Sequence, residues 1–153
     1  MSYEKLLNEA DDYDIYVHEE PMKPKIRGLY SDEVIWINKV ITSTNEKSCV
    51  LAEELGHYHT SSGNILDMTK LESRKQENQA RSWAHKKLIP LTKIIDAYKE
   101  GSSNRYELAE YLGVTEEFLL EAINSYKVEY GIYAKVDRYI IYFEPLAVLE
   151  LFE

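Results

Sequence analysis

The spacing of Glu53 and His57 constrains this chain more than any other feature of its sequence. The segment around them reads AEELGHYH over residues 52–59. In an α-helix of 3.6 residues per turn, side chains four positions apart differ by about 40° around the axis and share one face. Ser43, followed three residues later by Glu46, matches a capping box and predicts where this helix begins. The helix therefore presents a carboxylate and an imidazole on the same face.

The same segment matches a metal-binding motif with one change. In the motif H-E-x-x-H, two histidines at positions i and i+4 of a helix bind zinc, and the glutamate between them is the general base of a metalloprotease. Here Glu53 stands at the first histidine position, His57 at the second and Glu54 at the position of the base. The pattern predicts Glu53 and His57 as metal ligands and Glu54 as the catalytic residue.

A further candidate ligand, Glu77, lies on a second predicted helix. Extending the apolar stripe of that helix backward by three residues reaches Glu77, which predicts a carboxylate on the buried side. Such a carboxylate is costly unless it is paired, hydrogen-bonded or bound to a metal. It either forms a salt bridge with Arg74 or Arg81, or it is the third ligand of a site like that of the two-His, one-Glu zinc proteases. The stripe consists of Ala80, Ala84 and Leu88.

Other side chains near the motif have narrower possible roles. His59 points about 200° away from His57 if the helix continues, so it joins the site only if the helix ends near Tyr58. Otherwise it lies on the surface or supports the ligands. Gly56 lowers helix propensity by roughly 1 kcal/mol relative to alanine, and its missing side chain predicts a close approach by the second helix or by substrate. Cys49, the single cysteine, excludes an internal disulfide and is expected to be a small buried side chain.

At these residues the chain resembles a known family, the ImmA/IrrE metallopeptidases found in prophages, mobile elements and stress regulators. One stretch looks like the family's segment E-x-x-A-x-x-F-A, with Trp83 at the aromatic position. The resemblance extends over most of the chain, from about Tyr13 to Phe152. Three stretches carry it: VLAEELGH at residues 50–57, QENQARSWA at residues 76–84 and LIP at residues 88–90.

The resemblance implies a function and a set of site residues. It implies a cytoplasmic zinc peptidase that cuts a repressor protein, with His57 and Glu77 as metal ligands and Glu54 as the base. Glu53 departs from the family, where histidine is usual, and phage-type members with two glutamates at this point look the most similar. Two carboxylates and one histidine shift metal preference from Zn²⁺ toward harder ions such as Mn²⁺. A second hypothesis is therefore a weak or inactive homologue that acts as an antirepressor by binding its partner.

The remaining pattern predicts an α+β fold. Two arms rich in apolar residues, 27–30 and 33–38, predict a hairpin that turns at Ser31 and Asp32. We expect a small antiparallel sheet packed against the metal-site helices, as in a zincin-like core. An edge strand beside the metal would hold an extended substrate by main-chain hydrogen bonds. The other predicted elements are a helix over 3–13, a strand over 14–18, the motif helix ending at Gly63, a loop over 61–69, and helices over 71–88 and 91–99.

A polar joint, GSSN at residues 101–104, is the candidate boundary in the chain. A length of 153 residues fits one compact domain. We therefore expect a metallopeptidase-like core over residues 1–100. Residues 101–153 are expected to form a winged-helix-like part of the same unit, with a helix-turn-helix-like segment and a β-hairpin.

The charge of the chain predicts a protein partner. The second helix of the helix-turn-helix-like segment carries Glu116, Glu117 and Glu121 where a DNA reader needs donors. A net charge of −9 further disfavours nucleic acid and anionic lipid. A DNA-binding regulator is therefore the third and least favoured hypothesis. No apolar run approaches the roughly 20 residues of a membrane span, and no signal segment opens the chain, so the expected location is the cytoplasm of a bacterial host.

Overall fold

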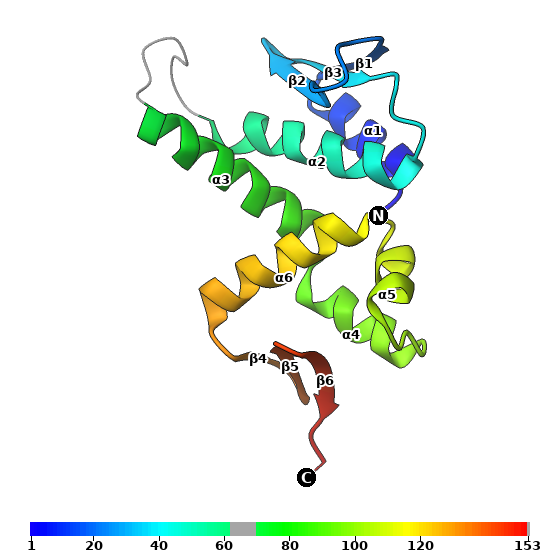
Figure 1. Ribbon diagram of the computed structural model, residues 1–153, viewed down its shortest axis with the longest axis vertical. Coiled ribbons are helices and arrows are strands. Elements are labelled where there is room, and N and C mark those ends of the chain that lie inside the picture. The colour runs from blue at the N-terminus through cyan, green and yellow to red at the C-terminus, as the bar shows by residue number, and fades with distance from the viewer. Residues whose placement is uncertain (62–69, 153) are drawn as a thin grey trace. The chain divides into compact units, whose positions relative to one another are not determined.

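The α+β class predicted from the sequence is confirmed. The computed structural model describes residues 1–61 and 70–152, and these hold six helices and six strands (Figure 1). The predicted end of the motif helix at Gly63 lies outside the described residues, as does most of the loop expected over 61–69. Within the described part of the chain, no helix is both long and apolar enough to cross a membrane.

The chain divides into two units, residues 1–84 and residues 85–153. The division falls within helix α3 (Lys70–Leu88), earlier than the boundary that the sequence predicted after residue 100. The reason is that α4 (Leu91–Lys99) belongs by its contacts to the second unit. It contacts α5 (Arg105–Leu112) and β5 (Tyr139–Phe143), which follow it in the chain, and its Ile94 and Ile95 are buried.

The first unit is built around the central strand of a three-stranded sheet. Its elements are α1 (Tyr3–Asp12), β1 (Tyr16–Glu20), β2 (Gly28–Ser31), β3 (Val34–Asn38), α2 (Thr44–Thr60) and the first part of α3. The strand order is β1-β3-β2, and α2 packs against β2 and β3 (Figure 1). Helices α1 and α2 both bury apolar side chains in the core of this unit. The core of this unit includes Leu6, Ala10, Ile35, Ile37, Leu51 and Leu55.

The sheet of the first unit is mixed, so the prediction of an antiparallel sheet was wrong here. β2 and β3 pair antiparallel, as the predicted hairpin requires, but β1 and β3 pair in parallel. The connection between β1 and β2 carries the chain past β3, so that β1 and β2 lie on opposite sides of that strand. The hairpin turns at Asp32 and Glu33, whose φ angles are 47° and 65°. A two-residue type I′ connection requires positive φ at both of its central positions.

Asn38, at the end of β3, holds the connection between β1 and β2 in place. Its side chain is fully buried. The amide nitrogen donates to the carbonyl oxygens of Met22, Lys23 and Ile26 at 2.8–3.2 Å. Its Oδ1 accepts from the backbone N–H groups of Met22 and Val40. Four of these five hydrogen bonds satisfy backbone groups of the connection, where regular strand pairing is missing, because buried polar groups require partners.

Helix α2 begins where the sequence predicts. The Ser43 hydroxyl accepts a hydrogen bond from the backbone N–H of Glu46 at 3.2 Å. This is the hydrogen bond that an N-cap residue forms. Gly56, near the other end, lies against the backbone of α3, and a Cβ added there would overlap the carbonyl group of Ala80. The predicted close approach of the second helix at this glycine is therefore confirmed.

The second unit combines a helical part with an antiparallel sheet. Its elements after α3 are α4, α5 (Arg105–Leu112), α6 (Glu116–Tyr130), β4 (Tyr133–Val136), β5 (Tyr139–Phe143) and β6 (Leu146–Glu150). Asn104 and Thr115 cap α5 and α6, and Gly113 ends α5 in the left-handed region with a φ of 72°. Glycine is the usual residue at such a helix end. The predicted hairpin is formed by β4 and β5. The third strand of this sheet, β6, was not predicted from the sequence. The winged-helix-like arrangement remains a prediction.

We predict that Gly56→Ala destabilises the first unit by about 1–3 kcal/mol, because the added methyl group meets backbone that cannot move without shifting a helix. The measurement is the free energy of unfolding in urea. Gln79→Ala, on the exposed face of α3 beside Ala80, is the matched control and should leave stability unchanged. Equal stability of wild type and Gly56→Ala would contradict the close helix contact.

Candidate functional site

A cavity of about 210 Å³ in the first unit brings together three of the four predicted site residues. Helix α2 contributes Glu54 and His57, and α3 contributes Glu77. Strand β2 closes one side of the cavity. The full lining consists of Gly28, Leu29, Tyr30, Glu54, His57, Ser61, Ser73, Gln76 and Glu77.

Strand β2 lies directly over Glu54 because residue 28 has no side chain. A Cβ at Gly28 would lie 2.7 Å from Cγ1 of Val50 and 3.2 Å from Oε1 of Glu54. A Cβ at residue 28 could not lie this close to Val50 and Glu54 unless the strand or these side chains moved. The glycine therefore lets the backbone of an edge strand approach the carboxylate, and it removes water from one side of Glu54.

Burial, together with the negative charges of Glu53 and Glu77, raises the pKa of Glu54 from 4.5 to about 8. Desolvation disfavours the charged form of a carboxyl group, and like charges nearby do the same. Burial and these charges therefore favour the protonated form of Glu54. A perturbed carboxyl group inside a cavity is typical of catalytic sites.

His57 and Glu77 face each other across the cavity. The distance from His57 Nε2 to Glu77 Oε1 is 3.4 Å. The Glu77 side chain is 53% exposed, so its predicted place on the buried side of α3 was wrong. The reason is that three residues turn a helix through about 300° and not a full circle. Glu77 is thereby rotated away from the buried stripe that begins at Ala80. Its described ion-pair partner is His57 and neither of the two nearby arginines.

The side chains fit a metal ion only in part. Two ligands of a tetrahedral ion with bonds of about 2.0–2.2 Å lie about 3.4 Å apart, which is the separation of the His57 and Glu77 atoms. Glu53 is not among the residues that line the cavity. Among residues 1–61 and 70–152, no group of three or more His, Cys, Asp or Glu side chains could hold a metal ion. The described side chains therefore provide two ligand positions and lack the third that a catalytic zinc site needs.

His59 lies away from this cavity because α2 continues through Thr60. Its ring stacks on Trp83 with 4.6 Å between centroids and meets the ring of Tyr13 edge-on at 4.8 Å. His59 could join His57 at the site only if the helix ended near Tyr58, and the helix does not end there. Cys49 is buried, as expected for a structural side chain.

The sequence reading missed several residues of the cavity. Tyr30 lines it, and burial together with the neighbouring Tyr58 raises the Tyr30 pKa, so this phenol remains a hydrogen-bond donor. Gly28 had a recognisable signal, because a glycine within a strand often marks the close approach of another backbone. Ser73 and Gln76 had none, since polar residues on an exposed helix face are ordinary.

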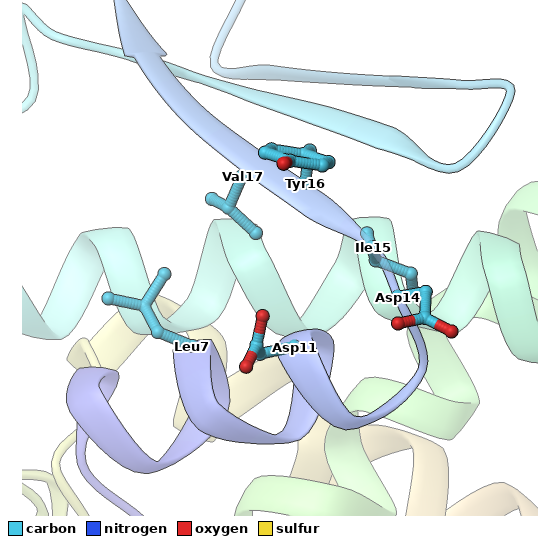
Figure 2. Close-up of a pocket in the computed structure, with 6 residues that line it drawn as sticks. All are labelled: Leu7, Asp11, Asp14, Ile15, Tyr16 and Val17. Atoms are coloured by element: carbon cyan, nitrogen blue, oxygen red, sulfur yellow. The ribbon is translucent and has the colours of Figure 1, made fainter.

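A second cavity of the first unit, about 370 Å³, lies between α1 and β1. Figure 2 shows Val17 of β1 pointing toward α1, where Leu7 and Asp11 lie, with Asp14 and Ile15 on the connecting turn. Its lining includes two aspartates and no histidine among the residues described. The pairing of a carboxyl group with an imidazole is therefore a property of the cavity around Glu54.

Comparison with known proteins identifies a family. The family Peptidase_M78, described as the IrrE N-terminal-like domain, matches residues 10–124, which is well over half of the chain. This range contains both helices of the Glu54 cavity. Neither the curated proteins nor the solved structures include a significant match.

We predict that Glu54→Gln stabilises the metal-free protein at high pH. The folded-state pKa of Glu54 lies above its unfolded value, so the stability that this group contributes is complete below about pH 4.5 and is lost as pH rises toward about 8. Glutamine does not ionise and avoids this loss. In chelator at about pH 9 the variant should exceed wild type by at least about 1 kcal/mol in free energy of unfolding, and the difference should shrink by about pH 5.

The control for this measurement is Glu100→Gln, which removes one negative charge from an exposed position of the second unit. A pH-independent difference between wild type and Glu54→Gln would show that the Glu54 carboxyl group ionises normally in the folded chain.

Proposed function

The chain belongs to the Peptidase_M78 family, and from this premise we propose that it is a metal-dependent endopeptidase that cleaves a repressor protein of a phage or mobile element. One observation carries the proposal. Glu54, His57 and Glu77 line a single cavity directly beside an edge strand of the sheet. An acid–base group, two candidate ligands and a place for an extended polypeptide therefore occur together.

Strand β2 supplies the substrate-binding part of the proposal. It lies at one edge of the order β1-β3-β2, and Gly28, Leu29 and Tyr30 on this strand line the cavity. An extended peptide that adds to such an edge forms main-chain hydrogen bonds, and side-chain pockets then provide specificity. A peptide bound along β2 would pass beside Glu54, because the strand itself lies over that carboxyl group.

Glu54 has the properties of a group that both takes and returns a proton. A catalytic acid or base works best with a pKa near the operating pH, and burial moves this carboxyl group into that range. Glu54 would accept a proton from the attacking water and pass it to the leaving amine. His57 and Glu77 would hold the Zn²⁺ or Mn²⁺ ion. Such an ion supplies a bound water of lowered pKa when it is present.

The incomplete ligand set favours a second candidate function. Because Glu53 does not join His57 and Glu77 in the described structure, metal affinity and peptidase activity are expected to be low. A chain with the same edge strand and weak catalysis would act on a repressor by binding it, as an antirepressor. The two functions share the binding surface and differ only in whether the peptide bond is cut.

We predict that Glu54→Gln abolishes cleavage of the repressor encoded beside this protein while leaving its fold and metal content unchanged. Glutamine cannot accept the proton of water, so the loss should be at least about 10²-fold. Glu53→His restores the two-histidine motif and should raise the zinc content per chain and the cleavage rate. The measurement is repressor cleavage by the three proteins, with bound metal determined on the same samples.

Each result of this comparison separates the two candidates. Equal cleavage by wild type and Glu54→Gln would remove Glu54 from the mechanism. Absence of cleavage by all three proteins, together with loss of repressor activity on mixing, would identify a binding antirepressor. Glu121→Gln, which makes the same chemical change at an exposed position of the second unit, is the matched control and should cleave like wild type.

We also propose that the chain does not act by reading DNA. Glu116, Glu117 and Glu121 are all exposed on α6, the helix that would lie in the major groove of a helix-turn-helix protein. We predict no sequence-selective retardation of a promoter fragment by the pure protein at physiological salt. Retardation that weakens with salt and depends on sequence would overturn this prediction, because phosphate contacts have that dependence.

A further inference from the structure

A cavity in the second unit has no part in the proposed peptidase chemistry. Its volume is about 720 Å³, within the range of sites that bury small organic molecules. Helix α4, the segment before α5, α5 itself and strand β6 line it, and all belong to residues 85–153. The Glu54 cavity belongs to the other unit, residues 1–84.

The walls of this cavity are apolar and already fixed by the core. Ile94, Leu108 and Val148 are buried side chains that also face the cavity. Pro145 and Leu146, at the start of β6, extend the apolar surface, and the ring of Tyr98 is partly exposed at the same cavity. A preformed apolar surface of this kind binds an apolar body without first having to become ordered.

The polar side of the cavity carries one cation whose charge no described acidic side chain balances. Arg105 lines the cavity and is exposed, and the structure describes no ion pair for it. The nearest acidic group in sequence, Glu107, already accepts hydrogen bonds from Ser103 and Asn104. The hydroxyl of Ser102 is a second polar group on the lining. In a chain of net charge −9, an available guanidinium beside apolar walls favours an anion.

We propose that this cavity binds a small organic anion with an apolar body, such as a medium-chain carboxylate. The apolar body would pack against Ile94, Leu108 and Val148, and the carboxylate would bind the Arg105 guanidinium, with the Ser102 hydroxyl as a further donor. A neutral apolar molecule would leave Arg105 without a partner. A nucleotide would place polar rings against apolar walls, and it would meet only one cation among the described lining residues.

The test uses sodium octanoate as the probe and 1-octanol as its uncharged match in the full chain, with binding followed by calorimetry and by amide chemical shifts. Octanoate should bind more tightly than octanol, and both should shift amides of α4, α5 and β6. Arg105→Gln should weaken octanoate binding roughly three- to tenfold and leave octanol binding unchanged. Arg138→Gln, an exposed arginine of the same unit outside the cavity, should change neither.

Ala147→Phe provides a second variant that acts through volume. Residue 147 lines the cavity and is exposed on β6, so the larger side chain should fill the space without disturbing the core and should reduce binding of both probes. Equal affinity of wild type and Arg105→Gln for octanoate would overturn the proposal. Self-association that Ala147→Phe abolishes, without binding of either probe, would identify the cavity as a contact between copies and would also overturn it.

Discussion

The contact between Gly56 and the backbone of Ala80 is the constraint on which the functional cavity depends. It brings α2 and α3 closer than side chains would normally allow. Because His57 follows Gly56 and Glu77 lies about one turn before Ala80, this contact places the imidazole and the carboxylate opposite each other at 3.4 Å. Gly28 has the corresponding effect for β2 over Glu54. Two missing side chains therefore determine the geometry of the cavity.

Local features of the fold could be predicted from the sequence, and long-range ones could not. The Ser43 cap, the hairpin of β2 and β3 and the α5–α6 helix pair depend on residues within a few positions of each other. The parallel pairing of β1 with β3 and the strand β6 depend on how distant segments meet. The exposure of Glu77 is a local feature that helix periodicity could have predicted, because a step of three residues from Ala80 leaves the buried stripe. For the site, the spacing of the motif predicted that Glu53 and His57 share one face of α2, whereas the cavity is lined by Glu54 and His57. The spacing carried no information on where Glu53 lies relative to α3, because side chains four residues apart on one helix can contact different neighbouring elements.

Charge balance is the common problem of the residues around Glu54. Three glutamates and one histidine gather near a single cavity, and Glu54 is shielded from water by β2. Repulsion among these carboxylates and the burial of Glu54 favour its protonated form, and this is why the pKa of Glu54 is raised. A divalent cation would take over the role of that proton and favour the charged form of the same carboxyl group. Proton and cation are therefore expected to compete, and metal affinity should rise with pH.

The side chain of Asn38 has a consequence for the segment that leads into the cavity-lining strand β2. The connection that leads into β2 is held chiefly by hydrogen bonds to this one amide, whereas β3, which carries it, is held by strands on both sides. Segments held by few contacts open with lower free energy than the core that surrounds them. Residues 21–27 are thus expected to detach as one cooperative piece while the strands and helices of this unit stay folded. Amide exchange along the connection that leads into β2 would then be governed by the environment of a residue that does not itself line the cavity.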